Sequence, residues 1–293
     1  MATQRDIKNR IVSIKNTKKI TSTMEMVSTS KMKKMQGRLE KSKPYEEKVN
    51  HIIADLLAFG GSGFNDPLLK EIANPTRALI FQITGNRGLC GSFNANVTSK
   101  TMELKDKLEL EGKEAQIYVV GKKGINFYNF INQRLFRTAP NPEDKFTFDE
   151  AAKIGAELTN FFLSGEFHEI YISYTKVLSS ASQKSEVIKL LPIAPMVEEQ
   201  TDVLPPTSTD YYFEPNPAKI FSYILPLYIK VKLFTCFLES GFSEQFARRV
   251  AMKNATDASS EMIRELTVRY NRARQAKITN EIAEIVGGAA ALE

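Results

Sequence analysis

The sequence predicts an α/β protein with a long antiparallel coiled coil, in which N- and C-terminal helices pair as a shaft and an α/β domain is inserted between them. Three observations lead to this prediction. The first sixty residues contain no glycine before Gly37 and no proline before Pro44. The middle of the chain alternates apolar runs with amphipathic stretches, and the segment from Phe242 to Leu292 again lacks proline. Long uninterrupted segments at both termini are typical of helices that pair with one another.

The N-terminal segment, residues 1–60, is predicted to be one long helix. Its apolar residues recur at helical spacing, although a polar stretch from Lys15 to Lys19 shifts the phase of the stripe. Pro44 lies inside the pattern, so a kink or a break is expected there. At about 1.5 Å per residue the helix would be roughly 80 Å long, so much of it must project from any compact domain. The stripe consists of Ile7, Ile11, Ile14, Ile20, Met24, Val27, Met32, Met35 and Leu39.

Residues 75–192 are predicted to form a small Rossmann-like α/β domain. Apolar runs that resemble buried strands alternate with helical patterns, which favours a largely parallel sheet. The next segment, residues 193–216, contains Pro205 and Pro206 and is expected to be a linker. Strands are expected at Ala78–Ile83, Gln116–Val120, Glu169–Thr175 and Glu186–Leu191, and helices near Asn94–Leu110, Lys122–Ile131 and Phe148–Leu163.

The C-terminal segment, residues 217–293, is predicted to be helical and to pair with residues 1–60. Pro217 suits a helix start, and Pro226 is expected to separate a short first helix from a long second one. The stripe expected to face the N-terminal helix is rich in small residues, which let two helix backbones approach closely. It consists of Ala251, Ala255, Ala258, Met262, Leu266, Ala273, Ile278, Ile282 and Ile285.

Composition narrows the class of protein. An apolar fraction of 42% and a charged fraction of 25% fit a soluble protein with a real core. No run approaches the roughly 20 uninterrupted apolar residues of a membrane span, because Pro226, Lys230 and Lys232 interrupt the most apolar one. The N-terminus shows no secretory signal, so the chain is expected to stay on the cytoplasmic side. Two distant cysteines, Cys90 and Cys236, predict free structural thiols, and neither a disulfide nor a metal is expected.

Positive charge is concentrated at the N-terminus. Between Met1 and Lys43 there are twelve Lys and Arg residues against three acidic ones, whereas the whole chain carries a net charge of +6. This concentration indicates an anionic partner: nucleic acid, a membrane surface or an acidic protein loop. A coiled-coil nucleic-acid-binding protein is therefore an alternative, although Tyr45 is the first aromatic residue and the apolar stripe favours a helical partner. The apolar end, Ile285–Leu292, would aggregate unless another protein surrounded it.

No pattern in the chain predicts catalysis or a bound cofactor. Residues Gly85–Gly91 follow a strand and precede a helix, but their spacing, GxxGxxG, differs from that of dinucleotide-binding loops, and a tight turn is expected. The phosphate-binding pattern GxxxxGK(S/T) is absent from the sequence, and neither His51 nor His168 has a recognisable nucleophile nearby. The sequence therefore argues against an enzyme in its own right.

Short motifs occur in order along nearly the whole chain. The N-terminal ones are Asp6-Ile-Lys-Asn-Arg-Ile, Asn16-Thr-Lys-Lys-Ile-Thr21, Met24-Glu-Met-Val27 and Ser30-Lys-Met32, and the central one is Arg87-Gly-Leu-Cys-Gly91. The C-terminal ones are Ser243-Glu-Gln, Ala247-Arg248, Ala251-Met-Lys-Asn-Ala-Thr-Asp257, Tyr270-Asn-Arg-Ala-Arg-Gln275, Ile278-Thr279 and Glu284-Ile-Val286. In this order and spacing the motifs resemble the gamma subunit family of the rotary F-type ATP synthase.

The resemblance implies a non-catalytic central rotor stalk that couples proton translocation through a membrane c ring to ATP synthesis or hydrolysis at beta subunits. The implied partners are the ring of three alpha and three beta subunits, the epsilon subunit and the c ring, and not nucleic acid. The implied location is peripheral, on the cytoplasmic face of the bacterial inner membrane.

The resemblance also implies roles for individual residues. Arg274 and Gln275 match positions that hydrogen-bond a catch loop on beta, and Thr279 and Glu281 lie one turn further along. Two further sets are implied: Arg248 and Met24 match shaft positions important for coupling, and Tyr211 and Glu214 fall in the segment that abuts the c ring.

Overall fold

The structure is a computed structural model that describes residues 3–60, 66–179, 182–193 and 217–290. The chain divides into two compact units, each described by itself. The first combines Met1–Ser30 with Arg248–Glu293, and the second is Lys31–Ala247. The domain boundaries predicted from the sequence, at residues 60, 75, 192 and 217, were placed at the ends of expected helices and strands and not by compactness. They remain a prediction.

Two long helices, α1 (Gln4–Gly60) and α5 (Pro217–Ala290), contribute to both units. Pro217 starts α5 as predicted, but the prediction of a helix break at Pro226 is wrong, because α5 continues through it. A proline inside a helix costs about 3 kcal/mol. The flanking residues Phe221, Leu225 and Ile229 are fully buried. Since burying one large apolar side chain contributes about 1.5–3 kcal/mol, this packing offsets the cost and keeps the helix intact. The helix α1 likewise continues through Pro44.

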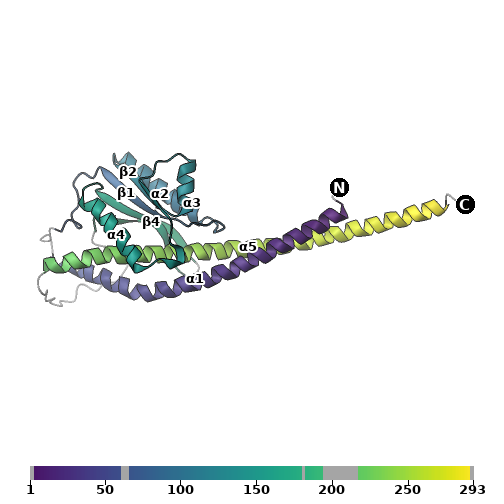
Figure 1. The fold of residues 1–293 in the computed structure, drawn as a ribbon, viewed down its shortest axis with the longest axis horizontal. Helices are drawn as coiled ribbons and strands as arrows, with labels where there is room; N and C mark the ends of the chain where they lie inside the picture. Colours follow the sequence, from purple (N-terminus) through teal and green to yellow (C-terminus); the bar gives the residue numbers. More distant parts are fainter. Residues whose placement is uncertain (1–2, 61–65, 180–181, 194–216, 291–293) are drawn as a thin grey trace. The chain divides into compact units, whose positions relative to one another are not determined.

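In the first unit the two helices run antiparallel and side by side (Figure 1), and the hydroxyls of Thr21 and Thr256 lie 2.8 Å apart. Buried and half-buried residues recur on both helices at spacings of three and four, as in helices that pack side by side. On α1 they include Ile7, Ile11, Ile14, Lys18, Thr21, Glu25 and Ser28, and on α5 they include Arg248, Met252, Ala255, Ser259, Ile263, Leu266, Tyr270 and Ala273.

The predicted apolar stripes are therefore partly wrong. On α1 the polar Thr21 and Ser28 are buried, whereas Ile20 and Val27 are 60% and 51% exposed. On α5 Ala255 is half-buried as expected, but Ala258 and Met262 are exposed, as are Ile278, Ile282 and Ile285. A hydrophobicity pattern cannot identify this interface, because small polar residues satisfy their hydroxyls within the helices and so permit close packing.

Replacing Ala255 with leucine is expected to overpack the paired helices and to lower the free energy of unfolding by about 1–3 kcal/mol. Ala258→Leu is the matched control, since it adds the same atoms three residues away at an exposed position. Denaturant unfolding of the two variants measures the difference. Equal losses would show that Ala255 does not lie at the tight part of the interface.

The second unit contains a five-stranded sheet of order β3-β2-β1-β4-β5. The first four strands are parallel, and β5 pairs antiparallel with β4. The four predicted strands are confirmed and are slightly longer than expected, whereas the short β3 was not predicted. Their bounds are β1 Arg77–Ile83, β2 Glu114–Val120, β3 Arg137–Ala139, β4 Glu169–Val177 and β5 Gln183–Leu191.

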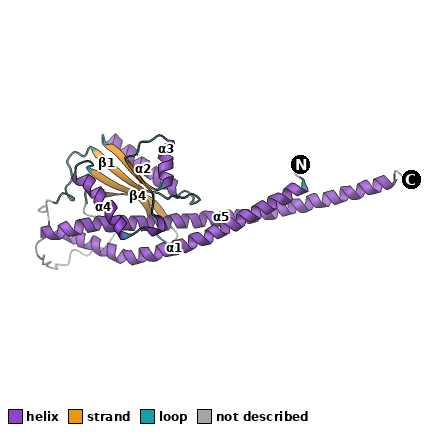
Figure 2. Cartoon of the chain, viewed as in Figure 1, coloured by secondary structure: helices purple, strands orange, loops and turns teal. Residues whose placement is uncertain are grey.

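Helices cover both faces of the sheet (Figure 2), as in a Rossmann-like domain. Apolar residues of α2 (Phe93–Leu110) and α3 (Lys122–Phe130) pack on one face. The main core lies on the other face, where α4 (Phe148–Leu163) and α5 pack together with Val49 and Ile53 of α1. A capping box between Thr147 and Glu150 begins α4. The turn η2 (Glu143–Lys145) precedes it.

The core role of α5 explains its apolar character. Among the described residues, one helical segment, within Lys219–Gly287, is long and apolar enough to cross a membrane by length and composition. Although Pro226, Lys230 and Lys232 interrupt its apolar residues, the mean hydropathy of this segment is still high enough for a membrane span. Half of its most apolar window is buried inside the protein, where Phe221 and Leu225 belong to the main core. The core helix of a folded domain passes the same test.

Candidate partner-binding surfaces

The C-terminal end of α5 carries the four residues predicted to contact the beta catch loop. Arg274, Gln275, Thr279 and Glu281 are all exposed. Their spacing places Arg274 and Glu281 two turns apart on one row of the helix, and Gln275 and Thr279 on the adjacent row. The hydroxyl of Thr279 donates to the backbone carbonyl of Gln275 at 3.0 Å. Glu281 pairs with Lys277 at 3.4 Å. The structure thus presents these polar side chains on one surface.

Large apolar side chains lie on the same stretch of helix. The described residues from Arg274 to Gly287 are all exposed, including Ile285 at 72% and Val286 at 61%. Ile278 and Ile282 are also exposed. Isoleucine and valine at these exposures form an apolar strip, which is a mark of a surface that another protein covers.

The N-terminal part of α1 has a similar exposed face, but a basic one. Arg5, Lys8, Arg10, Lys15 and Lys19 are exposed there. Four large apolar residues share this exposure, at 51% to 63%: Val12, Ile20, Met26 and Val27. A face that combines cations with apolar groups fits an acidic protein better than it fits a partner bound through charge alone.

Arg248 and Met24 differ from the catch residues in their surroundings. Arg248 is only 6% exposed and Met24 is half-buried, although both were predicted as partner contacts. Arg248 engages in a polar or ring contact within the chain. A buried arginine that is already engaged is better placed to hold its own chain together than to reach another subunit. Tyr211 and Glu214, predicted to face the c ring, lie outside the described residues.

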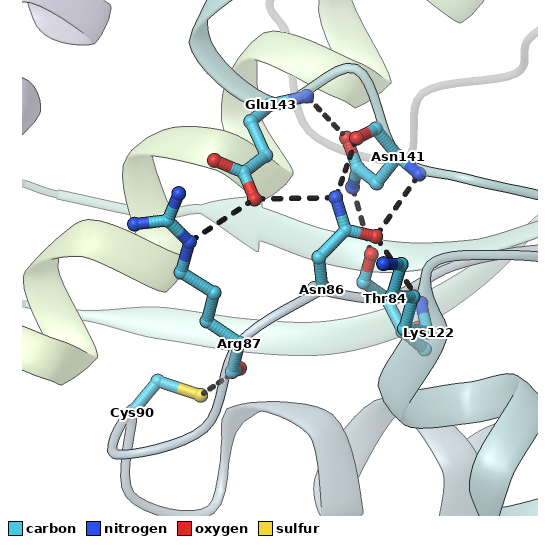
Figure 3. A network of polar contacts seen from close by, with 7 residues as sticks. All are labelled: Thr84, Asn86, Arg87, Cys90, Lys122, Asn141 and Glu143. Atoms are coloured by element: carbon cyan, nitrogen blue, oxygen red, sulfur yellow. Dashed lines mark hydrogen bonds and ion pairs between the residues drawn. The ribbon is translucent and has the colours of Figure 1, made fainter.

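The glycine-rich residues Gly85–Gly91 form a compact turn at the carboxyl end of β1, as predicted. Asn86 organises this turn (Figure 3): its side-chain amide donates to the Asn141 carbonyl at 2.6 Å and to Glu143 Oε1 at 3.2 Å. Its side-chain oxygen accepts from the backbone N–H groups of Lys122 and Asn141, both at 3.2 Å. These bonds join the loops that follow β1, β2 and β3.

The network also decides what the turn can bind. Glu143 Oε1 lies 3.6 Å from Arg87 Nε, and Asn141 donates to the Thr84 carbonyl at 2.7 Å. A carboxylate beside the turn repels a phosphate, so the arrangement favours a structural role. Sequence reasoning missed Asn86, Asn141 and Glu143. The signal available was an asparagine in each of two loops, because asparagine side chains readily hydrogen-bond neighbouring backbone.

The remaining residues considered for chemistry have structural contacts. His168 Nδ1 accepts a hydrogen bond from the Thr76 N–H at 3.0 Å. This bond holds the imidazole ring beside the residue that precedes β1. Cys90 and Cys236 are both buried thiols. Within the described residues no group of three or more His, Cys, Asp or Glu side chains is arranged to hold a metal ion.

These observations define a class of protein: a helical stalk subunit whose exposed surfaces serve contacts with other chains. The family model described as ATP synthase matches residues 3–292. The ATP synthase gamma chain of Leptospira biflexa is 40% identical over 292 residues and covers all of both chains. That of Halothermothrix orenii is 40% identical over 293 residues with the same coverage. The chain belongs to the ATP synthase gamma chain family.

Solved structures share the fold. A chain of the Euglena gracilis mitochondrial ATP synthase, from a structure of OSCP, F1 and c ring, has a TM-score of 0.67 at 19% identity and covers 99% of this chain and 94% of its own. A chain from the central stalk and c ring of the Tetrahymena thermophila enzyme has a TM-score of 0.57 at 24% identity and covers 80% and 99%. The family resemblance and the fold class inferred from the sequence are thus confirmed, and the nucleic-acid-binding alternative has no support.

Proposed function

We propose that this chain is the central rotor stalk of an F-type ATP synthase, which couples proton translocation through a membrane c ring to ATP synthesis or hydrolysis at beta subunits. Membership in the gamma chain family carries the proposal. The exposed ends of α1 and α5 support it, because both expose large apolar side chains that a surrounding ring of alpha and beta subunits would cover. The epsilon subunit and the c ring are the further partners, and the complex places the chain peripherally at the cytoplasmic face of the bacterial membrane.

The proposed mechanism is mechanical. The paired helices present different side chains on each side, so each beta subunit around them meets a different surface. Each beta subunit is thereby biased towards a different affinity for nucleotide, and rotation exchanges the biases. The basic face of α1 suits acidic loops on the beta subunits. Copurification of the chain with alpha and beta subunits tests the assignment, and a chain that failed to assemble with them would contradict it.

The chain itself is proposed to be non-catalytic. Its glycine-rich turn is joined to neighbouring loops through Asn86, and the sequence contains no phosphate-binding loop. The isolated protein is therefore expected neither to hydrolyse ATP nor to bind it tightly. Equilibrium dialysis with ATP checks this, and stoichiometric binding in the micromolar range would overturn it.

Arg274 and Gln275 are proposed to hydrogen-bond a catch loop on beta, with Thr279 and Glu281 extending the contact. Losing one charge-assisted hydrogen bond costs about 1.5–3 kcal/mol. Arg274→Ala is therefore expected to lower the turnover of the assembled complex, while nucleotide binding by isolated beta subunits stays unchanged. The measurement is ATPase activity and ATP-driven proton pumping of the reconstituted complex.

Arg134→Ala is the control for this prediction, since Arg134 is exposed on the α/β domain. An arginine with contacts of its own, such as Arg77, would not be a neutral control, because Arg77 pairs with Glu114 at 3.7 Å and lies over the Phe167 ring. Equal activities of the Arg274 and Arg134 variants would remove the basis for the catch contact.

A further inference from the structure

The glycine-rich turn contains a close contact with α5. Gly85 comes directly after Thr84, at the carboxyl end of β1. A methyl group added at Gly85 would lie 2.9 Å from Cδ of Glu244 and 3.0 and 3.1 Å from its two carboxylate oxygens. All three atoms of the carboxylate group would thus lie within 3.1 Å of the added methyl group. The carboxylate therefore packs closely against Gly85, and a methyl group at this position would require the end of the Glu244 side chain to shift.

Glu244 is placed unusually for a glutamate. It is 3% exposed, and the neighbouring Ser240 and Ser243 are 2% and 0% exposed. Carboxylates are rarely buried without a specific partner, because removing them from water is costly. Glu244 does have an interaction partner within the chain. This face of α5 is therefore polar and buried, in contrast to the apolar face formed by residues such as Leu238 and Phe242.

The backbone of Gly85 is held from both sides. Its N–H donates to Oδ1 of Asn94, on α2, at 2.9 Å, and its carbonyl accepts from the Lys123 N–H, on α3, at 3.0 Å. The turn is therefore rigidly connected to both helices on the far face of the sheet. A residue that packs against Gly85 is therefore held in position relative to the whole α/β domain.

We propose that Glu244 is a positioning residue whose carboxylate, packed against Gly85, holds the α/β domain at one position along α5. This inference rests on the proposed rotor function. In the rotor, the contact would pass torque applied to the α/β domain into α5 and keep the domain from sliding along the helix.

A double-mutant cycle tests the proposal. Gly85→Ala introduces the methyl group that meets the carboxylate, Glu244→Ala removes the carboxylate, and the double variant has room for the methyl group. In reconstituted complexes, each single variant is expected to lower the ratio of protons pumped to ATP hydrolysed by about threefold or more, and the double variant to be no worse than Glu244→Ala. Gly37→Ala is the control, because no heavy atom lies within 4 Å of the added methyl group.

Two readouts separate the possible outcomes. The melting temperature of the isolated chain reports the contact itself: non-additive losses support it, and additive losses overturn it. If the melting temperature changes non-additively while the pumping ratio of every variant stays at the wild-type value, the contact is only structural and the positioning role is overturned. If Gly85→Ala yields no soluble protein, soluble expression of the double variant supports the contact in the same way. Failure of the wild-type chain to assemble would instead contradict the rotor function.

Discussion

Gly121→Ala is expected to lower the free energy of unfolding by about 3–5 kcal/mol, because both backbone strain and a collision act at this position. Gly121 has a φ of +108°, a conformation that residues with a side chain rarely adopt. An added methyl group would lie 2.1 Å from the Thr84 carbonyl oxygen and 2.6 Å from its hydroxyl.

The neighbour that the methyl group would meet cannot easily move. The Thr84 N–H donates to the Val120 carbonyl at 2.7 Å, and its hydroxyl donates to the same carbonyl at 2.9 Å. The hydroxyl also accepts from the Gly124 N–H at 3.1 Å. Relieving the collision would therefore break bonds that join the ends of β1 and β2 to α3.

Denaturant unfolding measures this effect against a matched control, Gly112→Ala. Gly112 also has a positive φ, of +79°, but no heavy atom lies within 4 Å of the added methyl group. The control thus reports the cost of backbone strain alone. If both variants lost the same stability, close approach to Thr84 would not be the reason for glycine at position 121.

Glu239→Gln is expected to stabilise the protein at pH 8 by up to about 3 kcal/mol, and to change little at pH 5. Glu239 lies half-buried on α5 and accepts a hydrogen bond from the Val177 N–H. Burial raises the pKa of Glu239 from its ordinary value of 4.5 to about 7, and the neighbouring Glu46 adds to the rise. Lys176 and Lys232 act in the opposite direction without cancelling it.

The sign follows from proton binding. Between pH 4.5 and about 7 the native state keeps the proton on Glu239, whereas the unfolded state has lost it. The unfolded state therefore binds fewer protons, so the free energy of unfolding falls as pH rises through this window and levels off above it. Glutamine stays neutral at every pH, which removes this contribution.

Denaturant unfolding between pH 5 and pH 8 checks the expectation. Glu261→Gln is the control, because Glu261 is an exposed glutamate on the same helix. A shallower pH dependence for Glu239→Gln alone supports the assignment. Parallel curves for wild type and the Glu239 variant would contradict it.

Local signals in the sequence predicted most of the secondary structure. The helix predicted near Phe148–Leu163 has these bounds in the structure, where a capping box begins it. Four strands were found from apolar runs between turn residues. The short β3 was missed, since three residues with little burial have no pattern to detect. Motifs spread along the chain also sufficed to recognise the family.

The sequence by itself determined the family, the helical ends and the order of strands and helices, because propensity, periodicity and turn chemistry act over a few residues. The tertiary structure alone decided which faces are buried. Thr21 and Ser28 are covered while Ile20 and Val27 are exposed, because the phase of a coiled coil depends on the partner helix. It likewise decided that α5 continues through Pro226 and that Glu244 meets Gly85. These are contacts between residues distant in the chain, whose energies no local pattern records.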